Sequence, residues 1–522
     1  MSNKEKFIQE IESGYTHKGD SIILGGAMLD GEVMTNSLVT IPLKTMNRHG
    51  LIAGATGSGK TKTLQILAEQ LSKKGVPVLL MDVKGDLSGI AVPSGGHPKI
   101  DERHAKIGIP FTAGASPVEL LSLSEEPGVR LRATVTEFGP VLFSKILELN
   151  ETQSGIVAVV FKYCDDKNIA LLDLKDMRKA LQYLTSEGKE EMEAEYGRLS
   201  SASVGTIMRK IVELEQQGAE VFFGERSFDV DDLTRMDENG RGVVSILRLT
   251  DLQDKPKLFS TFMLQMLAEV YASFEEEGDA GQPKLVIFID EAHLVFSEAS
   301  KALMDQIEAI VKLIRSKGVG LFFVTQNPTD VPDDVLGQLG MKMQHALRAF
   351  TAKDRKAIKL ASQNYPDSDY YDTETLLTEL GIGEALVTVL NEKGIPTPLA
   401  HTMLRAPESR MDVLTDKEIK KIVDNSALVG KYNETIDRES AYEILGGKIE
   451  QAAEAEHQQK MEKQQKKATT SRRKEKSTIE KVASSTATRQ IGRTVARELT
   501  RGLLGVLGIR STTRRRKKSS WF

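Results

Sequence analysis

The stretch that decides the fold of this chain is Gly54-Ala55-Thr56-Gly57-Ser58-Gly59-Lys60-Thr61, which follows the apolar run 51–53. It matches G-x-x-x-x-G-K-[ST], the phosphate-binding P-loop, at every fixed position. Glycines let the backbone wrap a phosphate chain closely and point N–H groups at it. A helix expected over about 60–72 adds its positive N-terminal end. A glycine-rich turn without a ligand is the alternative, and the strand–loop–helix context argues against it.

The motif assigns a role to each polar residue that it contains. Lys60 is expected to neutralise the β- and γ-phosphates of a nucleotide, and the Thr61 hydroxyl is expected to hold Mg²⁺. The predicted nucleotide-binding residues are Gly54, Ala55, Thr56, Gly57, Ser58, Gly59, Lys60, Thr61 and Lys62.

A second strand supplies the carboxylates that such a site needs. The run 284–289 is apolar, rich in β-branched residues, and ends in Asp290 and Glu291. Asp290 is expected to bind Mg²⁺ directly or through water. Glu291 is expected to orient and deprotonate the attacking water, since phosphoryl transfer depends on positioning more than on covalent chemistry. An ordinary strand end with acidic residues on a helix N-terminus is the alternative.

Two further strand ends carry polar residues. The strand 319–325 is followed by Gln326, which is placed to hydrogen-bond the γ-phosphate or the water, although it could equally face solvent. The strand 76–82 ends in Asp82. Because ligands gather at the carboxyl edge of open α/β sheets, Asp82 could orient the site, or it could cap the turn 83–86.

The order of apolar runs and amphipathic segments predicts an α/β fold with a mainly parallel sheet. Residues 21–24 and 37–42 are expected to form a hairpin. From 140 to 217 apolar residues recur near a 3.6-residue period, which indicates a helical insertion. We divide the chain into a short strand segment (1–47), two parts of the nucleotide-binding core (48–139 and 241–405) around the insertion (140–240), a helical extension (406–450) and a basic tail (451–522).

Composition favours a folded protein of two or three modules. The chain has 522 residues, 40% hydrophobic and 28% charged, and no apolar run approaches the ~18–20 residues of a membrane span. Its N-terminus leads into no apolar signal region. The single cysteine, Cys164, excludes an intramolecular disulfide and is expected to be a small core residue. A reducing cytoplasm is the expected location.

The tail differs in charge from the rest of the chain. Residues 451–522 contain 19 Lys+Arg and 6 Asp+Glu, whereas the remainder contains 51 and 68. Within the tail, 488–509 is predicted to form a basic amphipathic helix, with an arginine row at Arg489, Arg493, Arg497 and Arg501. Such a helix could dock on the body or on a neighbouring subunit. It could also bind nucleic acid, or bind an anionic membrane or another partner.

Several segments together resemble a known group of proteins. They are Asn47-Arg48-His49-Gly50, Asp290-Glu291-Ala292-His293, and the stretch from Ile314-Arg315-Ser316-Lys317 to Thr325-Gln326-Asn327-Pro328. These residues resemble the HerA/FtsK superfamily of ring-forming motor ATPases, and the chain is most similar to its HerA-like helicase-domain family, YjgR-like proteins included. Similar segments at 134–140, 201–205 and 383–387 extend the resemblance over most of 40–405.

The resemblance implies a RecA-like P-loop NTPase fold, Mg²⁺-dependent ATP hydrolysis, a homo-oligomeric hexameric ring and translocation of duplex DNA. In such rings an arginine near position 315 can reach the γ-phosphate of a neighbouring subunit. Arg315 is therefore a candidate for that role, with Arg348 and Arg355 in reserve, although a cation there is also a favourable partner for a helix C-terminus.

Two other functions are alternatives to a DNA motor. Asp290-Glu291-Ala292-His293 spells the box of DEAH helicases, but their Gln-x-x-Gly-Arg-x-Gly-Arg element is absent and the interval from Lys60 to Asp290 is long for them. The second alternative is an ATP-switched assembly protein with slow hydrolysis that recruits a protein partner through its tail. The motifs that predict ATP hydrolysis do not indicate which polymer or partner the hydrolysis would move.

Overall fold

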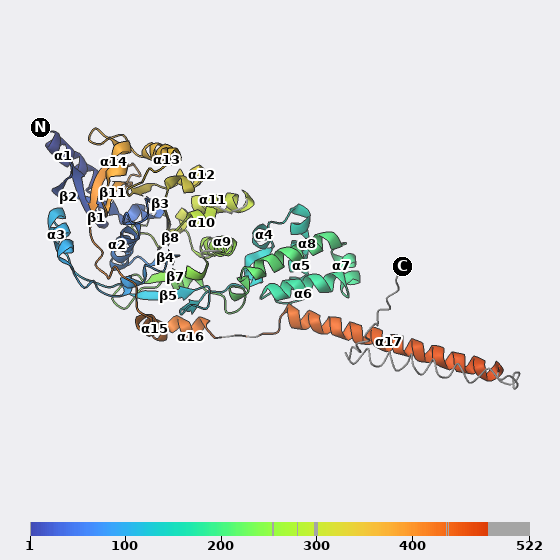
Figure 1. The fold of residues 1–522 in the computed structure, drawn as a ribbon. Coiled ribbons are helices and arrows are strands. Elements are labelled where there is room, and N and C mark those ends of the chain that lie inside the picture. Colours follow the sequence, from blue (N-terminus) through green and yellow to red (C-terminus); the bar gives the residue numbers. More distant parts are fainter. Residues whose placement is uncertain are drawn as a thin grey trace, which may run out of the picture. The chain divides into compact units, whose positions relative to one another are not determined.

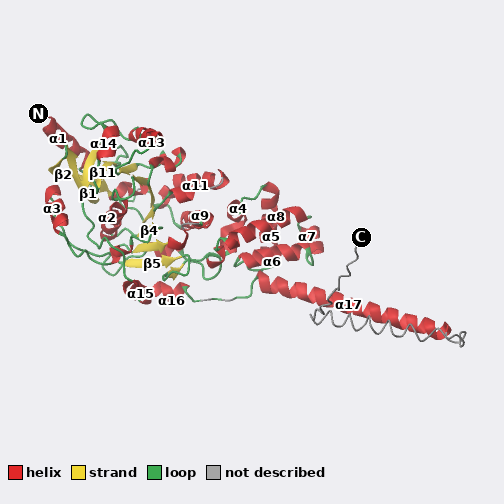
Figure 2. Cartoon of the chain, viewed as in Figure 1, coloured by secondary structure: helices red, strands yellow, loops and turns green. Residues whose placement is uncertain are grey.

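The computed structural model describes residues 2–252, 255–278, 280–296, 301–434, 436 and 438–478. Within them, one twelve-stranded sheet runs in the order β2-β1-β12-β11-β10-β3-β9-β8-β4-β7-β5-β6. Figures 1 and 2 show helices packed around this sheet and a separate group of helices, α4 to α8. The strands are β1 (Ser21–Leu29), β2 (Glu32–Pro42), β3 (Gly50–Ala53), β4 (Val78–Asp82), β5 (Val118–Ser122), β6 (Val129–Arg130), β7 (Val244–Arg248), β8 (Leu285–Ile289), β9 (Val319–Thr325), β10 (Met341–Gln344), β11 (Glu384–Thr388) and β12 (Ala400–Leu404).

The eight strands β10, β3, β9, β8, β4, β7, β5 and β6 are parallel to one another, so the predicted mainly parallel sheet is confirmed. Every residue of β3, β8 and β9 is buried. Strands covered on both faces read as continuous apolar runs, which is why these segments could be recognised in the sequence. Because the strands are parallel, the loops that follow β3, β4, β8, β9 and β10 all emerge at one edge.

The rest of the sheet is antiparallel. The predicted hairpin is present as β1 and β2, and its turn uses Asp30 and Gly31, with φ of 49° and 78°. Two successive positive φ values match the twist of a tight hairpin. β1 also pairs with β12, and Gly25 lies so close to that strand that a Cβ would meet the Met403 carbonyl oxygen at 1.9 Å. The hairpin therefore extends the nucleotide-binding sheet.

The helices around the sheet bury their apolar sides against it. Leu64, Leu67 and Leu71 of the helix after the P-loop belong to the main core. The helices of this group are α1 (Asn3–Tyr15), α2 (Lys60–Lys73), α3 (Pro98–Ile107), α9 (Pro256–Ser273), α10 (His293–Phe296), α11 (Lys301–Ile314), α12 (Asp333–Leu336), α13 (Ala352–Ser362) and α14 (Thr373–Glu379).

A short helical turn precedes the predicted start of the insertion at 140, and the backbone kinks at Gly139 between the two pieces. Thr134 accepts a hydrogen bond from the Glu137 backbone N–H, and Glu137 reaches back to the Thr134 N–H, so a capping box begins the first helix at Val135. Cys164 is 2% exposed, as expected of a core residue. The insertion helices are α4 (Val135–Ile146), α5 (Glu151–Asp166), α6 (Leu174–Thr185), α7 (Lys189–Glu195) and α8 (Ser201–Gln216).

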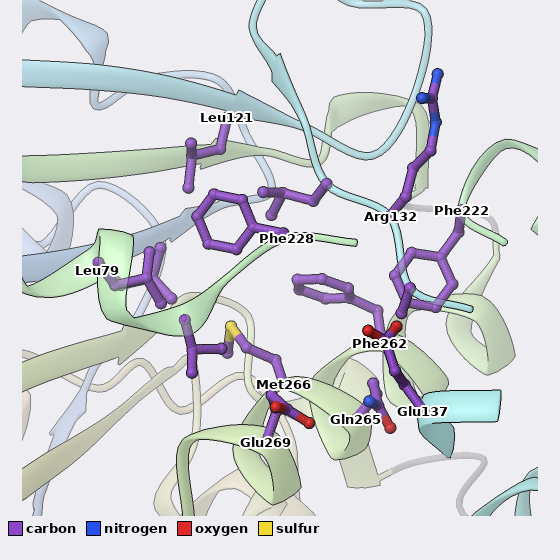
Figure 3. Close-up of a pocket in the computed structure, with 14 residues that line it drawn as sticks. Leu79, Leu121, Arg132, Glu137, Phe222, Phe228, Phe262, Gln265, Met266 and Glu269 are labelled. Atoms are coloured by element: carbon purple, nitrogen blue, oxygen red, sulfur yellow. The ribbon is translucent and has the colours of Figure 1, made fainter. Parts of the chain in front are cut away.

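A mostly apolar pocket lies where the insertion joins the core (Figure 3). Phe222, Phe228 and Phe262 face it, together with Leu79 of β4 and Leu121 of β5. The P-loop and the Asp290–Glu291 pair do not line it. The pocket is therefore lined mainly by apolar side chains, and the residues predicted to bind nucleotide lie outside it.

After β12 the chain crosses the P-loop helix as a strap, residues 405–414. Gln65 of α2 donates to Ser409 Oγ at 2.7 Å and to the Arg410 carbonyl at 2.9 Å. The strap leads into α15 (Asp416–Asp424), α16 (Ala427–Tyr432) and α17 (Ala441–Thr478). The Tyr442 backbone N–H donates to Asp176 of the insertion at 2.7 Å, so the start of α17 is fastened to the helical insertion.

The chain divides into two compact units, 1–447 and 448–522. Residues 451–466 of the second unit are exposed helix, as expected of a solvated polar segment. The predicted amphipathic helix at 488–509 lies outside the described residues. No helix in the described part of the chain combines the length and apolar character that a membrane span requires.

The strap contact at Glu69 gives a pH-dependent prediction. Its carboxylate accepts the Glu408 and Ser409 backbone N–H groups at 2.9–3.0 Å, yet burial outweighs these bonds and raises its pKa to about 7. Because the folded pKa exceeds the ordinary value, ionisation destabilises the fold as pH rises from about 4.5 to 7. The amide oxygen of Glu69→Gln still accepts hydrogen bonds but carries no charge. As pH rises from 5 to 8, we therefore expect the unfolding free energy of this variant to increase by about 2–3 kcal/mol relative to that of the wild type.

Urea unfolding at both pH values measures this gain. Glu374→Gln, the same substitution at an exposed position on α14, is the matched control and should change stability far less than Glu69→Gln. A Glu69→Gln difference that stayed constant with pH would contradict the assignment.

Candidate nucleotide-binding site

The P-loop is held between the strands on either side of β3. The Gly54 backbone N–H donates to the Thr325 carbonyl of β9 at 3.2 Å, and the Ala55 N–H donates to the Ala346 carbonyl after β10 at 2.8 Å. Gly57 and Gly59 have φ of 78° and 116°, which side chains rarely tolerate. The loop can therefore turn tightly into α2 and point backbone N–H groups into its hollow.

Lys60 lies within that hollow. Its ammonium donates to the Gly54 carbonyl at 2.6 Å and to the Ala55 carbonyl at 3.2 Å, and the residue is 6% exposed. Burial lowers the pKa of Lys60, and Lys84 lowers it further, whereas Glu291 and Asp290 oppose the shift. A cation thus lies where the P-loop motif needs one.

Asp290 and Glu291 follow β8, two strands from β3 at the same edge of the sheet. Each is 5% exposed. Burial raises the pKa of Asp290 to about 7, against the opposing effect of Lys84. Glu291 has a φ of 47°, an uncommon value for a residue with a side chain, and His293 Nδ1 lies 3.1 Å from its Oε2. The structure therefore brings both predicted carboxylates to the P-loop edge.

The loop after β4 contributes residues that the sequence analysis missed. Asp82 accepts the backbone N–H groups of Gly85, Asp86 and Leu87 at 2.7–3.1 Å, so it caps this loop, which was one of its two predicted roles. Burial raises the pKa of Asp82 to about 6. The capped loop carries Lys84, which forms an ion pair with Glu291, and Asp86, whose Oδ2 lies 3.3 Å from Thr61 Oγ1.

The donor set fits a Mg²⁺ ion bound together with phosphate. Magnesium is commonly held by one or two carboxylates, a hydroxyl, water and substrate phosphates. Thr61 and Asp290 would hold it. Asp86 lies beside Thr61 through its Oδ2, and its Oδ1 is a buried oxygen without a hydrogen-bond partner among the described residues. The described residues contain no cluster of three or more His, Cys, Asp or Glu that would form an all-protein metal cage.

Gln326 and the candidate arginines fall in different places. Gln326 directly follows β9 at the P-loop edge and is exposed. Arg315 precedes β9, and this strand's seven residues span roughly 20 Å. It therefore lies at the opposite edge, where it lines a cavity with Lys44, Arg48 and Lys312, and cannot reach the P-loop of its own chain.

The reserve arginines lie on the P-loop side. Arg348 follows β10 and donates to the Thr378 carbonyl at 3.1 Å, and Arg355 is on α13. Lys62 donates to the Met411 carbonyl of the strap. This predicted binding residue therefore connects α2 with the C-terminal extension.

Two buried histidines support the P-loop. His345 Nε2 lies 2.9 Å from Thr63 Oγ1, and burial, reinforced by Lys60, lowers its pKa to about 4. His49 accepts the Leu321 N–H at Nδ1 (3.0 Å), and its Nε2 lies 2.8 Å from the Val311 carbonyl. His49 thereby ties the start of β3 to α11 and β9. In the sequence, the only signal for the supporting roles of His49 and His345 was that each lies next to a strand of the nucleotide-binding core.

The fold and the site together define a P-loop NTPase with a RecA-like core. The family model described as "Helicase HerA-like C-terminal" matches residues 28–512. The chain therefore belongs to the HerA-like helicase family. The narrower YjgR-like assignment stays a prediction.

Similar proteins agree with this family. The chain is 24% identical over 386 residues to the DNA double-strand break repair helicase HerA of Saccharolobus solfataricus, covering 69% of this chain and 66% of that protein. It is 23% identical over 368 residues to the HerA of Pyrococcus furiosus, covering 66% and 63%. The chain thus spans slightly less than two thirds of these relatives. A structure of the bacterial conjugative coupling protein TrwB matches 78% of this chain and 94% of its own with a TM-score of 0.50 at 14% identity, which shows a common fold.

The Asp82 cap yields a test of how the site is held together. Asp82→Ala leaves three buried or partly buried backbone N–H groups without their acceptor, so we expect a loss of about 2–4 kcal/mol in unfolding free energy and weaker nucleotide binding. Asp82→Asn, which keeps one acceptor oxygen, should fall between Ala and wild type. Urea unfolding and ATP titration measure both, and an unchanged Ala variant would show that the cap is dispensable.

Proposed function

We propose that this chain is a Mg²⁺-dependent ATP hydrolase that works as a homo-oligomeric, hexameric ring motor on duplex DNA. The observation that carries the proposal is the meeting of the P-loop, Asp290 and Glu291 at one sheet edge in a HerA-like chain. The description of its HerA relatives as DNA double-strand break repair helicases favours DNA as the polymer that is moved.

The proposed reaction uses the residues of this edge. Glu291 accepts a proton from water, whose oxygen bonds to the γ-phosphorus while the bond to the β,γ-bridging oxygen breaks and ADP leaves. Lys60 and the P-loop N–H groups bind the phosphate oxygens on which negative charge develops. Gln326 hydrogen-bonds the γ-phosphate or the water. Mg²⁺ held by Thr61 and Asp290 would neutralise charge on the β- and γ-phosphates.

Arg315 supports the proposed oligomeric ring. Its position at the edge opposite the P-loop means that it can assist hydrolysis only from a neighbouring subunit. Arginines supplied in this way stabilise the transition state of phosphoryl transfer. The site is then complete only between two copies of the chain.

The first prediction concerns turnover and its response to DNA. Wild-type ATP turnover, measured at fixed low salt, should rise saturably as duplex DNA is added. Glu291→Gln should retain ATP binding and lose about a hundredfold or more of turnover, because the general base is removed. Unchanged turnover in this variant would refute the role of Glu291. Wild-type turnover indifferent to DNA would instead favour an ATP-switched assembly protein with a partner bound through the tail.

The second prediction tests Arg315 in trans. Arg315→Ala and Lys60→Ala should each abolish turnover when alone. Mixed in equal amounts, the two should regain part of it, because an intact P-loop in one subunit can face an intact Arg315 in the next. Lys417→Ala, at an exposed position on α15, serves as a control with normal turnover. No recovery on mixing would assign Arg315 a structural role, and Arg348 and Arg355 would be tested in the same way.

A further inference from the structure

Lys84 is the residue of the site to which neither the motif nor the proposed reaction gives a role. Its ammonium forms an ion pair with Glu291, and their side chains are 35% and 6% exposed. Burial alone would lower the pKa of Lys84, but the bond to Glu291 and the charges of Asp290 and Asp86 raise it overall. Lys84 is therefore a cation bound directly to the proposed general base.

The position of Lys84 is fixed by the fold. It lies two residues after Asp82, whose carboxylate accepts three backbone N–H groups from the residues that directly follow Lys84. The same loop contacts the P-loop helix through Asp86 and Thr61. A long surface lysine would lose conformational entropy on pairing, but this one emerges from a loop that is already anchored at both ends.

A second cation, Lys60, lies in the same site. Its ammonium donates to the Gly54 and Ala55 carbonyls of the P-loop, and the charge of Lys84 lowers its pKa. Like charges held together in a partly buried site repel each other, and an anion with several negative charges relieves this repulsion. Glu291 and Asp290 offset part of the repulsion, and a terminal phosphate would offset more.

We propose that Lys84 contacts the terminal phosphate of ATP, so that it both discriminates ATP from ADP and positions Glu291 beside the γ-phosphate. This inference rests on the proposed ATPase function. One ammonium group offers three donors, enough to contact a phosphate oxygen and the Glu291 carboxylate at the same time. A γ-phosphate that shares the lysine is thereby held next to the general base, which Lys84 already pairs with in this structure.

The test compares two ligands that differ by one phosphate. Binding of a non-hydrolysable ATP analogue and of ADP, each with Mg²⁺, is measured by calorimetry on the full chain. Lys84→Gln should weaken the ATP analogue about tenfold or more and ADP by less than about threefold, because only the former loses a charge-assisted hydrogen bond. Turnover should also fall, since Glu291 loses its orienting partner. Lys84→Arg should keep most of the discrimination.

Lys74→Gln is the matched control, because Lys74 pairs with Asp20 at the exposed end of α2. It should change neither affinity nor turnover. Equal weakening of both ligands by Lys84→Gln, or no weakening, would overturn the inference, and Lys84→Met, which also removes the charge, answers the same question if the Gln variant does not fold. Failure of the proposed function is distinct, since it would appear in the wild-type chain as absence of ATP turnover, whatever the Lys84 variants bind.

Discussion

The structure depends on the hydrogen-bonded, parallel pairing of β10, β3, β9, β8 and β4. Because these five strands point the same way, their following loops meet at one edge. The Gly54 and Ala55 N–H groups extend the pairing into the P-loop itself, so the loop is part of the sheet's hydrogen-bond network. Every polar residue of the site other than Arg315 derives its position from this pairing.

The same pairing separates two kinds of chemistry. The predicted phosphate-binding residues lie at the carboxyl edge, and Arg315 lies at the amino edge. His49 joins the two levels, since it contacts both α11, which leads to Arg315, and β9, which leads to Gln326. His49, which directly precedes β3, thereby connects α11 and β9 to the strand that leads into the P-loop.

The C-terminal strap adds a second connection. It contacts Lys62, Gln65 and Glu69 along one side of the P-loop helix and continues toward the helical insertion, to which α17 is fastened at Tyr442. These contacts bury polar groups that must stay paired, which fixes the path of the strap. Hydrogen bonds thus link α2 to the strap, and the strap continues covalently into α15 and α16.

The sequence by itself determined the fold class, the P-loop, the Asp290–Glu291 strand end and the helical insertion, because each depends on local spacing or apolar periodicity. It also allowed both roles for Asp82, and it was silent on Lys84, Asp86 and His345. Only the tertiary structure decided these roles. Asp82 accepts N–H groups of the loop that follows it, and the Lys84–Glu291 ion pair joins the loops after β4 and β8, which are neighbours in the sheet. Ion pairs between distant loops leave no periodic trace in a sequence, whereas buried strands and glycine-rich turns do.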